Sequence, residues 1–450
     1  MAKHLFGTDG VRGIPGEYPL DDATIYAIGL ALGEHLRASG AEKRVLLGMD
    51  TRESGPLIAA TLARGLADAA ALPVFAGVIT TPGVACLVRE RDFAAGVVIS
   101  ASHNPWHDNG IKLISSNGMK LPDETEARLE RVILERRGTL PGKCAAGVAL
   151  VAERELDLAY LAFLRSRAIP GARLENLRIV LDCANGAASE LGPALFRSLG
   201  CEVISIHDRP DGRNINAACG ALHPENMQRK VVDTGAHLGV AFDGDADRAI
   251  FSSASGQLLN GDGTLLLLAC YFKSLGQLKG PAIVGTTMAN LGFERALARE
   301  GLKLARVPVG DRYVLEEMLR TGANLGGEQS GHIILLDDST TGDGLLTALK
   351  LACLVAQRGP LDQQVAGLKV FPQTIVNVKV REKPPLESIP AVASARADAE
   401  RALGDSGRIV LRYSGTEPLA RVMVEAESQA DVERWSQAIA SAIRSAIGAR

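Results

Sequence analysis

The sequence has no apolar run long enough to cross a membrane and no closely paired cysteines. Its most apolar stretch, Leu265–Phe272, falls far short of the roughly 20 residues of a membrane span and predicts a buried helix or strand segment. The opening residues, MAKHLFGTDGVRG, lack the apolar core of a signal peptide, so we expect none. The seven cysteines include no CxxC pair, which favours reduced thiols in the cytoplasm over a disulfide framework.

The sequence also lacks an excess of charge of either sign. It has 49 basic and 52 acidic residues, a formal net charge of −3 and a pI of about 6.3. Binders of nucleic acid or membrane surfaces usually carry a clustered basic excess, so neither partner is expected. Hydrophobic residues make up 46% of the chain, which excludes disorder as its main character. Its 450 residues predict three or four domains.

One local pattern recurs three times along the chain, in residues 43–66, 178–200 and 281–301. Each stretch runs from a short apolar segment through a polar turn into residues with helical apolar spacing. This is typical of α/β domains with parallel strands, although such a pattern also recurs by chance. The chain after residue 370 differs, because alternating segments precede a helical tail, which indicates a small α+β domain.

The predicted fold is therefore three related α/β domains plus a smaller α+β C-terminal domain. The alternating segments expected as strands of the last domain, and the helix that follows them, are Thr374–Val380, Arg408–Tyr413, Leu419–Glu425 and Ala430–Ile447. Glycine-, proline- and polar-containing stretches indicate the boundaries, and the predicted domains are residues 1–150, 151–255, 256–370 and 371–450.

An acidic loop, Asp243, Asp245 and Asp247, directly follows the apolar segment Leu238–Phe242. Three carboxylates this close should raise each other's pKa, and a bound divalent cation would remove that penalty. Oxygen ligands suit Mg²⁺ or Ca²⁺ and not Zn²⁺. The loop lacks the Gly and Glu of an EF-hand, and a DxDx[TV] phosphatase needs Thr or Val at position 247. A solvated acidic turn is the alternative.

A serine loop, SASHNP at residues 100–105, follows another apolar segment. His103 and His107 have the spacing of a metal pair, but Pro105 would break the helix that such a pair requires, so zinc is not expected. No GxSxG motif surrounds the serine. A phosphorylated Ser102, with a charge of about −1.5 to −2, would suit a cation held by the acidic loop. Lys112 is a candidate for neutralising a moving phosphoryl group; an ordinary turn serine and a surface lysine are the alternatives.

Two further loops have the composition of ligand sites. The GEQSGH segment, Gly327–His332, places Glu and Ser two residues apart between glycines, which suits adjacent sugar hydroxyls. The RYSGTEP segment, Arg412–Pro418, combines a cation, hydroxyls and glycine in one turn, which suits a phosphate; Arg421 adds a second cation. Ordinary turns remain the alternative for both.

These four loops, in this order and with FGTDGVRG at Phe6–Gly13, resemble the α-D-phosphohexomutase superfamily over the whole chain. GTDGVRG and GEQSGH are most similar to the branch that acts on glucosamine phosphates. The resemblance implies four domains around one cleft and Ser102 as a phosphoserine. It also implies one Mg²⁺ per chain, with the ligands Ser102, Asp243, Asp245 and Asp247.

The resemblance further implies roles for the other loops. Glu328 and Ser330 would hold sugar hydroxyls. The phosphate that is not reacting would be held by Arg412, Ser414, Gly415, Thr416 and Arg421. Further residues match family positions near the reacting centre, with their proton-transfer roles left open: Arg12, His103, Lys112, Arg248 and His332.

The implied reaction interconverts glucosamine 6-phosphate and glucosamine 1-phosphate through a hexosamine 1,6-bisphosphate, which serves as intermediate and activator. The implied partner is an amino-sugar phosphate, and the resemblance favours a homodimer. The alternatives are a phosphomannomutase/phosphoglucomutase of the same superfamily, a metal-dependent sugar phosphatase and a non-catalytic sugar-phosphate sensor.

Overall fold

The computed structural model describes residues 5–7, 10–38, 40, 43–138, 148–414 and 418–449. The chain divides into two compact units. One comprises Met1–Thr286 with Val307–Val365, and the other Thr287–Arg306 with Ala366–Arg450. Within the described residues, no helix is long and apolar enough to cross a membrane.

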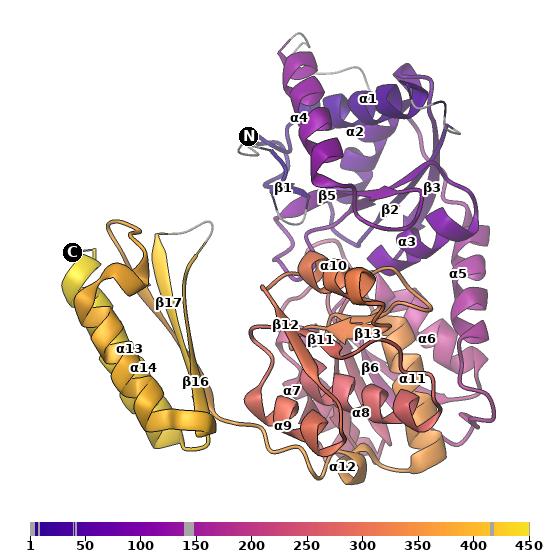
Figure 1. Ribbon diagram of the computed structural model, residues 1–450. Helices are drawn as coiled ribbons and strands as arrows, with labels where there is room; N and C mark the ends of the chain where they lie inside the picture. The colour runs from indigo at the N-terminus through magenta and orange to yellow at the C-terminus, as the bar shows by residue number, and fades with distance from the viewer. Residues whose placement is uncertain are drawn as a thin grey trace. The chain divides into compact units, whose positions relative to one another are not determined.

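The first unit opens with a five-stranded sheet in the order β1-β5-β4-β2-β3 (Figure 1). Strand β2 runs parallel to β3 and β4, whereas β5 runs antiparallel to both β4 and β1. The strands are β1 (Val11–Gly13), β2 (Arg44–Met49), β3 (Leu72–Val78), β4 (Ala95–Ile99) and β5 (Asn109–Ser115).

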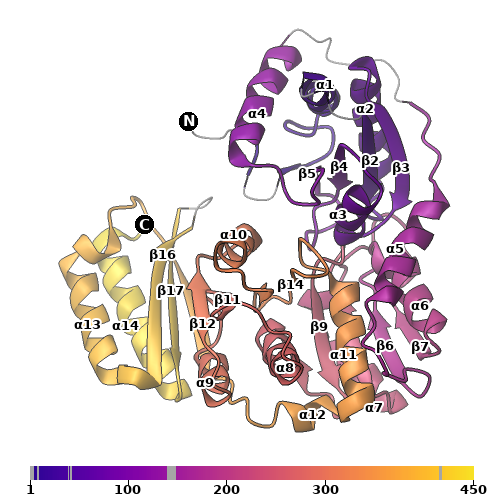
Figure 2. The same cartoon turned by 45° about the vertical axis from the view of Figure 1, so that its right-hand side comes forward.

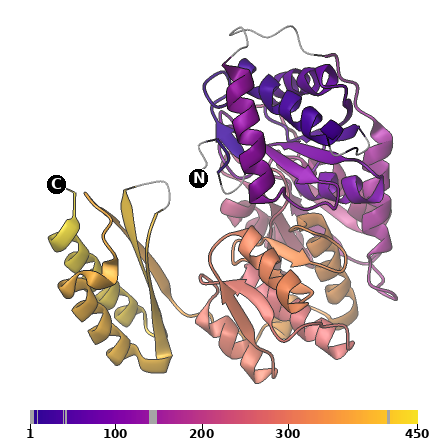
Figure 3. The same ribbon diagram turned by 45° about the horizontal axis from the view of Figure 1, so that its top comes forward.

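Helices cover both faces of this sheet, because its central strands are apolar on both sides. Helices α1 (Asp22–Ala38), α2 (Gly55–Asp68) and α4 (Asp123–Arg137) share one hydrophobic core with β2, β4 and β5. Figure 3 shows α4, in purple, beside the indigo helices of this group. Helix α3 (Thr81–Glu90) packs on the sheet as well, at Gly48 and Gly96, where an added Cβ would lie within 3 Å of Val84.

The second sheet has the order β10-β9-β8-β6-β7. Strand β6 is parallel to β7 and β8, and β8 is antiparallel to β9. The strands are β6 (Arg178–Asp182), β7 (Glu202–Ile206), β8 (Leu238–Phe242), β9 (Ala249–Ser253) and β10 (Leu258–Leu259). The helices that accompany them are α5 (Arg154–Ser166), α6 (Ala188–Ser198), η1 (Gly220–Leu222) and α7 (Glu225–Thr234).

The third sheet contains a parallel pair, β11 (Ile283–Thr286) and β13 (Leu325–Gly327), with β14 (Ile333–Leu335) antiparallel to β13. Its helices are α8 (Gly261–Ser274), α10 (Asp311–Thr321), α11 (Gly344–Arg358) and α12 (Leu361–Gln364) (Figure 2). The apolar stretch Leu265–Phe272 lies within α8, where most of its side chains are buried. The prediction of a buried segment there is confirmed.

The three sheets repeat one arrangement, in which a strand of a parallel pair turns back into an antiparallel neighbour. The turning pairs are β4 and β5, β8 and β9, and β13 and β14. Their connections are residues 100–108, 243–248 and 328–332, which contain the predicted serine, acidic and sugar loops. The prediction of three related α/β domains is confirmed, and equivalent turns of the three sheets carry the three loops.

The second unit contains an antiparallel sheet in the order β15-β17-β16, formed by β15 (Gln373–Lys379), β16 (Gly407–Tyr413) and β17 (Leu419–Ala426). Helices α13 (Pro390–Leu403) and α14 (Gln429–Ile447) pack on it around a core that includes Val422, Val424 and Ile439. The remaining elements are α9 (Leu291–Arg299), β12 (Leu304–Val307), η2 (Leu386–Ser388) and η3 (Gly404–Ser406). The predicted α+β C-terminal part is confirmed, with ends that shift by one residue.

Six of the seven cysteines lie in the described residues, and all six are free thiols, five of them buried. Cys144 lies outside the described residues. The expectation of reduced thiols holds for the six.

Candidate active site

Ser102 lies in the turn between β4 and β5 and is buried. Its φ of 51° puts it in the left-handed region, which few residues other than glycine adopt. In this conformation its Oγ donates a hydrogen bond to Asp243 Oδ2 at 2.7 Å. The serine loop of one sheet therefore meets the acidic loop of the next.

The three aspartates of the acidic loop converge on one point. Asp243, Asp245 and Asp247 are all buried, and each offers a carboxylate oxygen within 4.8 Å of the others. Asp243 Oδ1 accepts the Arg248 N–H at 3.2 Å. Asp245 Oδ1 and Asp247 Oδ1 are buried without a hydrogen-bond partner, which is costly unless a cation is present.

The aspartates differ in their proton affinity. Burial, followed by the charges of Asp247 and Asp245, raises the pKa of Asp243 well above its ordinary value. Burial alone would raise the pKa of Asp247 too, but His332, Lys112 and Arg248 lower it below its ordinary value. The expectation that neighbouring carboxylates raise each other's pKa holds for Asp243, whereas at Asp247 the surrounding His332, Lys112 and Arg248 outweigh that effect.

Two cations face the acidic cluster from different sheets. Lys112 on β5 is buried, and its Nζ lies 3.1 Å from Asp245 Oδ2 and 3.8 Å from Asp247 Oδ2. Arg248 follows the acidic loop, with its Nε 3.7 Å from Asp247 Oδ1. Lys112 and Arg248 thus lie next to the aspartates, as predicted. Their positive charges offset much of the negative charge of the cluster.

His103 lies next to Ser102, and Arg12 contacts the same loop. His103 Nδ1 is 3.4 Å from Ser102 Oγ and 3.4 Å from Arg248 Nη1. Burial, together with Arg248 and Arg12, lowers the pKa of His103 to about 4, so the ring is neutral at pH 7. Arg12 on β1 donates to Asn104 Oδ1 of the serine loop at 3.4 Å.

The sugar loop joins the same cluster through His332. Its Nε2 accepts the Gly342 N–H at 3.0 Å, which assigns the ring proton to Nδ1, and Nδ1 lies 3.6 Å from Asp247 Oδ2. Glu328 Oε1 accepts the Gly310 N–H at 3.1 Å. Ser330 is exposed at the tip of the loop. His332 thus faces the aspartate cluster, whereas Ser330 is exposed.

A cavity of about 250 Å³ lies beside this cluster. Lys112, Asp247 and His332 line it, together with apolar side chains such as Met119 and Leu315 and with further charged and hydroxyl side chains. Its walls come from the β5–α4 connection and from α10. The charged cluster is therefore accessible from between the first and third sheets.

The predicted phosphate residues belong to the second unit. Arg412 on β16 stands directly opposite Arg421 on β17, and Ser414 is buried next to them. Burial and the charge of Arg421 lower the pKa of Arg412. Two guanidiniums side by side repel each other, and an anion between them would relieve that repulsion. Gly415 and Thr416 lie outside the described residues.

The residues present fit a divalent cation. Asp243, Asp245 and Asp247 supply buried oxygens, two of which have no hydrogen-bond partner, and Ser102 Oγ is in contact with the same group. An all-oxygen set suits Mg²⁺ better than a metal that prefers nitrogen or sulfur ligands.

Comparison with known proteins finds similarity along the whole chain. Four family models match in order along it: phosphoglucomutase/phosphomannomutase α/β/α domain I at residues 3–138, domain II at 159–256, domain III at 260–371 and the C-terminal domain at 375–442. A phosphoglucosamine mutase from Solibacter usitatus is 52% identical over 100% of both chains. The chain belongs to the phosphoglucomutase/phosphomannomutase family.

Two further relatives agree with this membership. A phosphoglucosamine mutase from Koribacter versatilis is also 52% identical, over 99% of this chain and 98% of its own. The crystal structure of a phosphoglucomutase/phosphomannomutase family protein from Burkholderia thailandensis is 26% identical and has a TM-score of 0.79, with 97% of each chain covered. The similarity to the family thus extends through all four matched domains of the chain.

Sequence reasoning missed residues that hold these family loops in place. Thr81, at the start of α3, donates from its Oγ1 to Asp245 Oδ2 at 2.6 Å. Arg52 and Asp50, in the turn after β2, contact the serine loop, as does Asn216. For Asp50 and Arg52 the sequence signal is the polar turn within residues 43–66, which by itself predicts only a connection between a strand and a helix.

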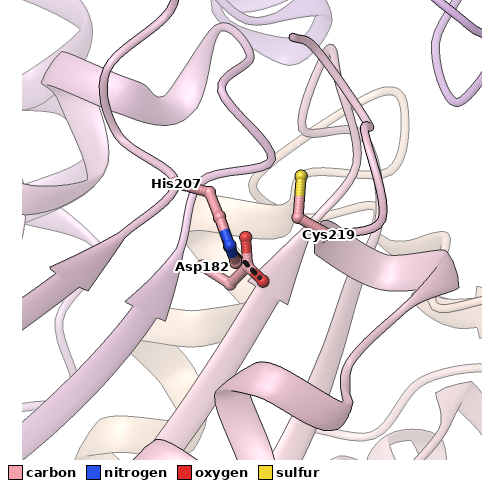
Figure 4. A group of neighbouring side chains, drawn as sticks. All are labelled: Asp182, His207 and Cys219. Atoms are coloured by element: carbon pink, nitrogen blue, oxygen red, sulfur yellow. Dashed lines mark ion pairs between the residues drawn. The ribbon is translucent and has the colours of Figure 1, made fainter.

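A second group of potential ligands lies at the carboxyl ends of β6 and β7. It comprises Asp182, His207 and Cys219 (Figure 4). Asp182 Oδ2 is 3.0 Å from His207 Nδ1, and its oxygens also accept the N–H groups of Ala184 and Gly220. Burial and Asp182 raise the pKa of the Cys219 thiol to about 12, which disfavours the thiolate that a metal requires. Asp182 is thus already satisfied, and this group holds the loop together.

Proposed function

We propose that the chain interconverts glucosamine 6-phosphate and glucosamine 1-phosphate, with Ser102 as the carrier of the phosphoryl group. The observation that carries this proposal is the contact of 2.7 Å between Ser102 Oγ and Asp243 Oδ2, inside a buried set of three aspartates. The two relatives at 52% identity are both phosphoglucosamine mutases, which supports glucosamine phosphates as the substrates.

The proposed metal is one Mg²⁺ per chain, held by Asp243, Asp245, Asp247 and Ser102. When bound, it supplies positive charge that offsets the charge on the phosphoryl oxygens. The unsatisfied oxygens of Asp245 and Asp247 support this assignment. Lys112 Nζ lies 3.1 Å from Asp245 Oδ2 and Arg248 Nε 3.7 Å from Asp247 Oδ1, so both would bring further positive charge to the transferring group.

The proposed reaction begins with phosphorylated Ser102. A sugar hydroxyl oxygen attacks the phosphorus, the bond between phosphorus and Ser102 Oγ breaks, and the hydroxyl proton is finally carried by Ser102 Oγ. The product is a hexosamine 1,6-bisphosphate. After this bisphosphate has turned around, Ser102 Oγ attacks its other phosphorus and the bond between that phosphorus and the sugar oxygen breaks. The proton from the serine hydroxyl ends on the sugar oxygen, and the isomeric monophosphate is released. Ser102 is phosphorylated again at the end, so no phosphate is consumed.

The side chains that would assist these steps form a short list, and their proton-transfer roles stay open. Neutral His103 is 3.4 Å from Ser102 Oγ, while Lys112, Arg12, Arg248 and His332 lie around the same centre. The catalytic set that we propose is Ser102, Lys112, His103, Arg248 and Arg12. Because either end of the sugar would react at the same serine, we expect several such groups around Ser102.

The proposed substrate contacts are of two kinds. Glu328, Ser330 and His332 bind the sugar, and the exposure of Ser330 supports that role. The non-reacting phosphate is bound by Arg412, Ser414, Gly415, Thr416 and Arg421. The paired charges of Arg412 and Arg421 suit a phosphate dianion attached to either end of the sugar, because they recognise charge more than shape.

The wider organisation is proposed from the sequence and the family. The domains are residues 1–150, 151–255, 256–370 and 371–450, which carry the serine, metal, sugar and phosphate loops in turn. The enzyme is cytoplasmic, takes a small amino-sugar phosphate as its partner and forms a homodimer.

A comparison of turnover rates tests the substrate. Glucosamine, glucose and mannose 6-phosphates are compared at equal concentration, and free phosphate is measured in the same samples. We expect kcat/KM to be highest for glucosamine 6-phosphate, with almost no free phosphate. A preference for glucose or mannose would instead assign the chain to the phosphomannomutase/phosphoglucomutase branch, and stoichiometric free phosphate would indicate a phosphatase.

A further inference from the structure

Arg52 carries a charge, yet only 1% of its surface is exposed. It lies in the turn between β2 and α2, where its Nε donates to Asp50 Oδ2 at 2.9 Å. A buried guanidinium is costly unless its charge is balanced and all its N–H groups are bonded. The remaining partners of Arg52 therefore indicate what it does.

All four of those partners are backbone carbonyls of residues 102–108, in the connection between β4 and β5. Arg52 Nη2 donates to the carbonyls of Ser102 and Asn104, both at 2.9 Å. Its Nη1 donates to the carbonyl of Asp108 at 2.9 Å and to that of Pro105. With the Asp50 contact, all five donors are used, so none is left for a substrate phosphate. Arg52 thus differs in kind from a phosphate-binding arginine.

The counter-ion of Arg52 reaches the same loop from the other side. Asp50 Oδ2 accepts the Ser100 hydroxyl at 2.6 Å, and Ser100 Oγ in turn accepts the Ser102 N–H at 2.9 Å. Both the N–H and the carbonyl of Ser102 are therefore tied to the Asp50–Arg52 pair. Asn216 adds a brace from the second sheet, because its Nδ2 donates to the carbonyls of Ser102 and Asn104 at 2.9 and 3.0 Å.

These bonds fix Ser102 in its left-handed conformation. A non-glycine residue at φ 51° costs free energy and persists only when its surroundings hold it there. The conformation is also the one that brings Ser102 Oγ to 2.7 Å from Asp243 Oδ2. The loop shape that Arg52 holds is thus the shape that presents the serine to the acidic cluster.

We propose that Arg52 is a positioning residue for phosphoryl transfer, which holds residues 102–108 so that the Ser102 oxygen keeps one place as it gains and loses its phosphoryl group. The proposal rests on the proposed function of Ser102. Arginine suits the task because its charge is permanent and its planar fork reaches four carbonyls at once, whereas lysine has three donors and no fork.

Kinetics of Arg52→Lys test the proposal. We expect kcat per folded molecule to fall about 100-fold while KM stays within about threefold, because a small misplacement of a reacting oxygen is expensive in rate and leaves the substrate contacts intact. A purely structural arginine would lower the melting temperature and the folded fraction and leave kcat per folded molecule unchanged. That second pattern would overturn the proposal.

Arg408→Lys is the matched control. Arg408 is also largely buried, pairs with Glu425, and donates to the carbonyls of Thr287 and Ala289 at 2.8 and 2.6 Å, all within the second unit. This variant should lower the melting temperature and leave kcat within about threefold. An equal loss of kcat in both variants would contradict a positioning role specific to Arg52.

Asn216→Gly keeps the proposal testable if Arg52→Lys does not fold. Glycine tolerates the φ of 59° at this position, so only the two side-chain hydrogen bonds are lost. We expect kcat to fall about tenfold with KM unchanged. Full activity in this variant would show that the hydrogen bonds of Asn216 do not help to position Ser102. Activity retained in Ser102→Ala would refute the proposed function itself, whereas a normal kcat in Arg52→Lys beside an inactive Ser102→Ala would refute only the positioning role.

Discussion

Thr81 Oγ1 donates a hydrogen bond to Asp245 Oδ2 at 2.6 Å, and the Thr81 N–H donates to the carbonyl of Asp245 at 3.0 Å. Lys112 Nζ approaches the same carboxylate oxygen at 3.1 Å. Both contacts fall on Oδ2, while Oδ1 is buried with no hydrogen-bond partner. Residues of the first sheet and its helix α3 thus orient an aspartate of the second, so that one oxygen remains available to a cation.

Thr81→Val should weaken Mg²⁺ binding, because it removes the hydroxyl and keeps the shape of the side chain. Residues that hydrogen-bond to a metal ligand, without binding the metal themselves, contribute about 10- to 100-fold to metal affinity. We therefore expect the half-saturating Mg²⁺ concentration to rise at least tenfold. Activity is measured against Mg²⁺ concentration, and metal binding is checked by calorimetry. Thr81→Ser keeps the hydroxyl and is the control; the same Mg²⁺ requirement in Thr81→Val as in the serine variant would contradict this role.

Ser102→Ala should abolish isomerisation, since it removes the oxygen that carries the phosphoryl group. The same variant should incorporate no label from glucosamine 1,6-bisphosphate labelled in its phosphates, whereas the wild-type protein should carry one phosphoryl group at Ser102 by site-mapped mass spectrometry. The fold should be preserved, as a circular dichroism spectrum would show. Mutase activity close to that of the wild type would rule out the proposed carrier.

Asp245→Asn should make activity strongly dependent on added Mg²⁺. The amide removes one of the three charges that hold the proposed cation, and it leaves Lys112 without the carboxylate nearest its Nζ. We expect the half-saturating Mg²⁺ concentration to rise by about tenfold or more. An unchanged metal requirement would mean that the acidic loop is not the metal site.

The parts of the site that the sequence revealed are contiguous loops at strand ends. Ser102, Asp243 and Glu328 each follow an apolar strand, and the carboxyl ends of strands are where α/β folds place ligands. The three sheets could be anticipated for the same reason, because each strand and helix has its own local pattern. The family resemblance then ordered the loops around a common reaction.

The parts that the sequence could not reveal depend on pairs of residues far apart in the chain. Thr81 and Asp245 are 164 residues apart, and Asn216 and Ser102 are 114 residues apart. A threonine at a helix start and an asparagine in a long turn are ordinary residues until folding supplies their partners. The lowered pKa of Asp247 has the same origin, since its cause is the approach of His332 and Lys112 from two other sheets.

Asp343 and Tyr160 form a buried pair beside the acidic and sugar loops, and neither residue belongs to the proposed catalytic set. Tyr160 donates from its hydroxyl to Asp343 Oδ2 at 2.8 Å, and Asp343 Oδ1 accepts the Leu346 N–H at 2.9 Å as the N-cap of α11. Burial raises the pKa of Asp343 from 3.8 to about 6, although these hydrogen bonds oppose the shift. The folded state therefore binds the proton of this carboxyl more tightly than the unfolded state does.

The sign of the resulting pH dependence follows from that order of pKa values. The contribution of Asp343 to stability is complete below pH 3.8 and is lost as the pH rises to about 6, by about 3 kcal/mol for a shift of roughly two units. Asp343→Asn keeps an oxygen for the helix cap and cannot ionise. We expect this variant to melt at a higher temperature than the wild type at pH 7 to 8, with the difference shrinking or reversing toward pH 4.5.

Calorimetric scans of both proteins across this pH range measure the difference in melting temperature. Tyr160→Phe, which removes the opposing hydrogen bond, should steepen the decline in stability with rising pH. A melting-temperature difference between Asp343→Asn and wild type that does not change with pH would show that Asp343 does not titrate in this range.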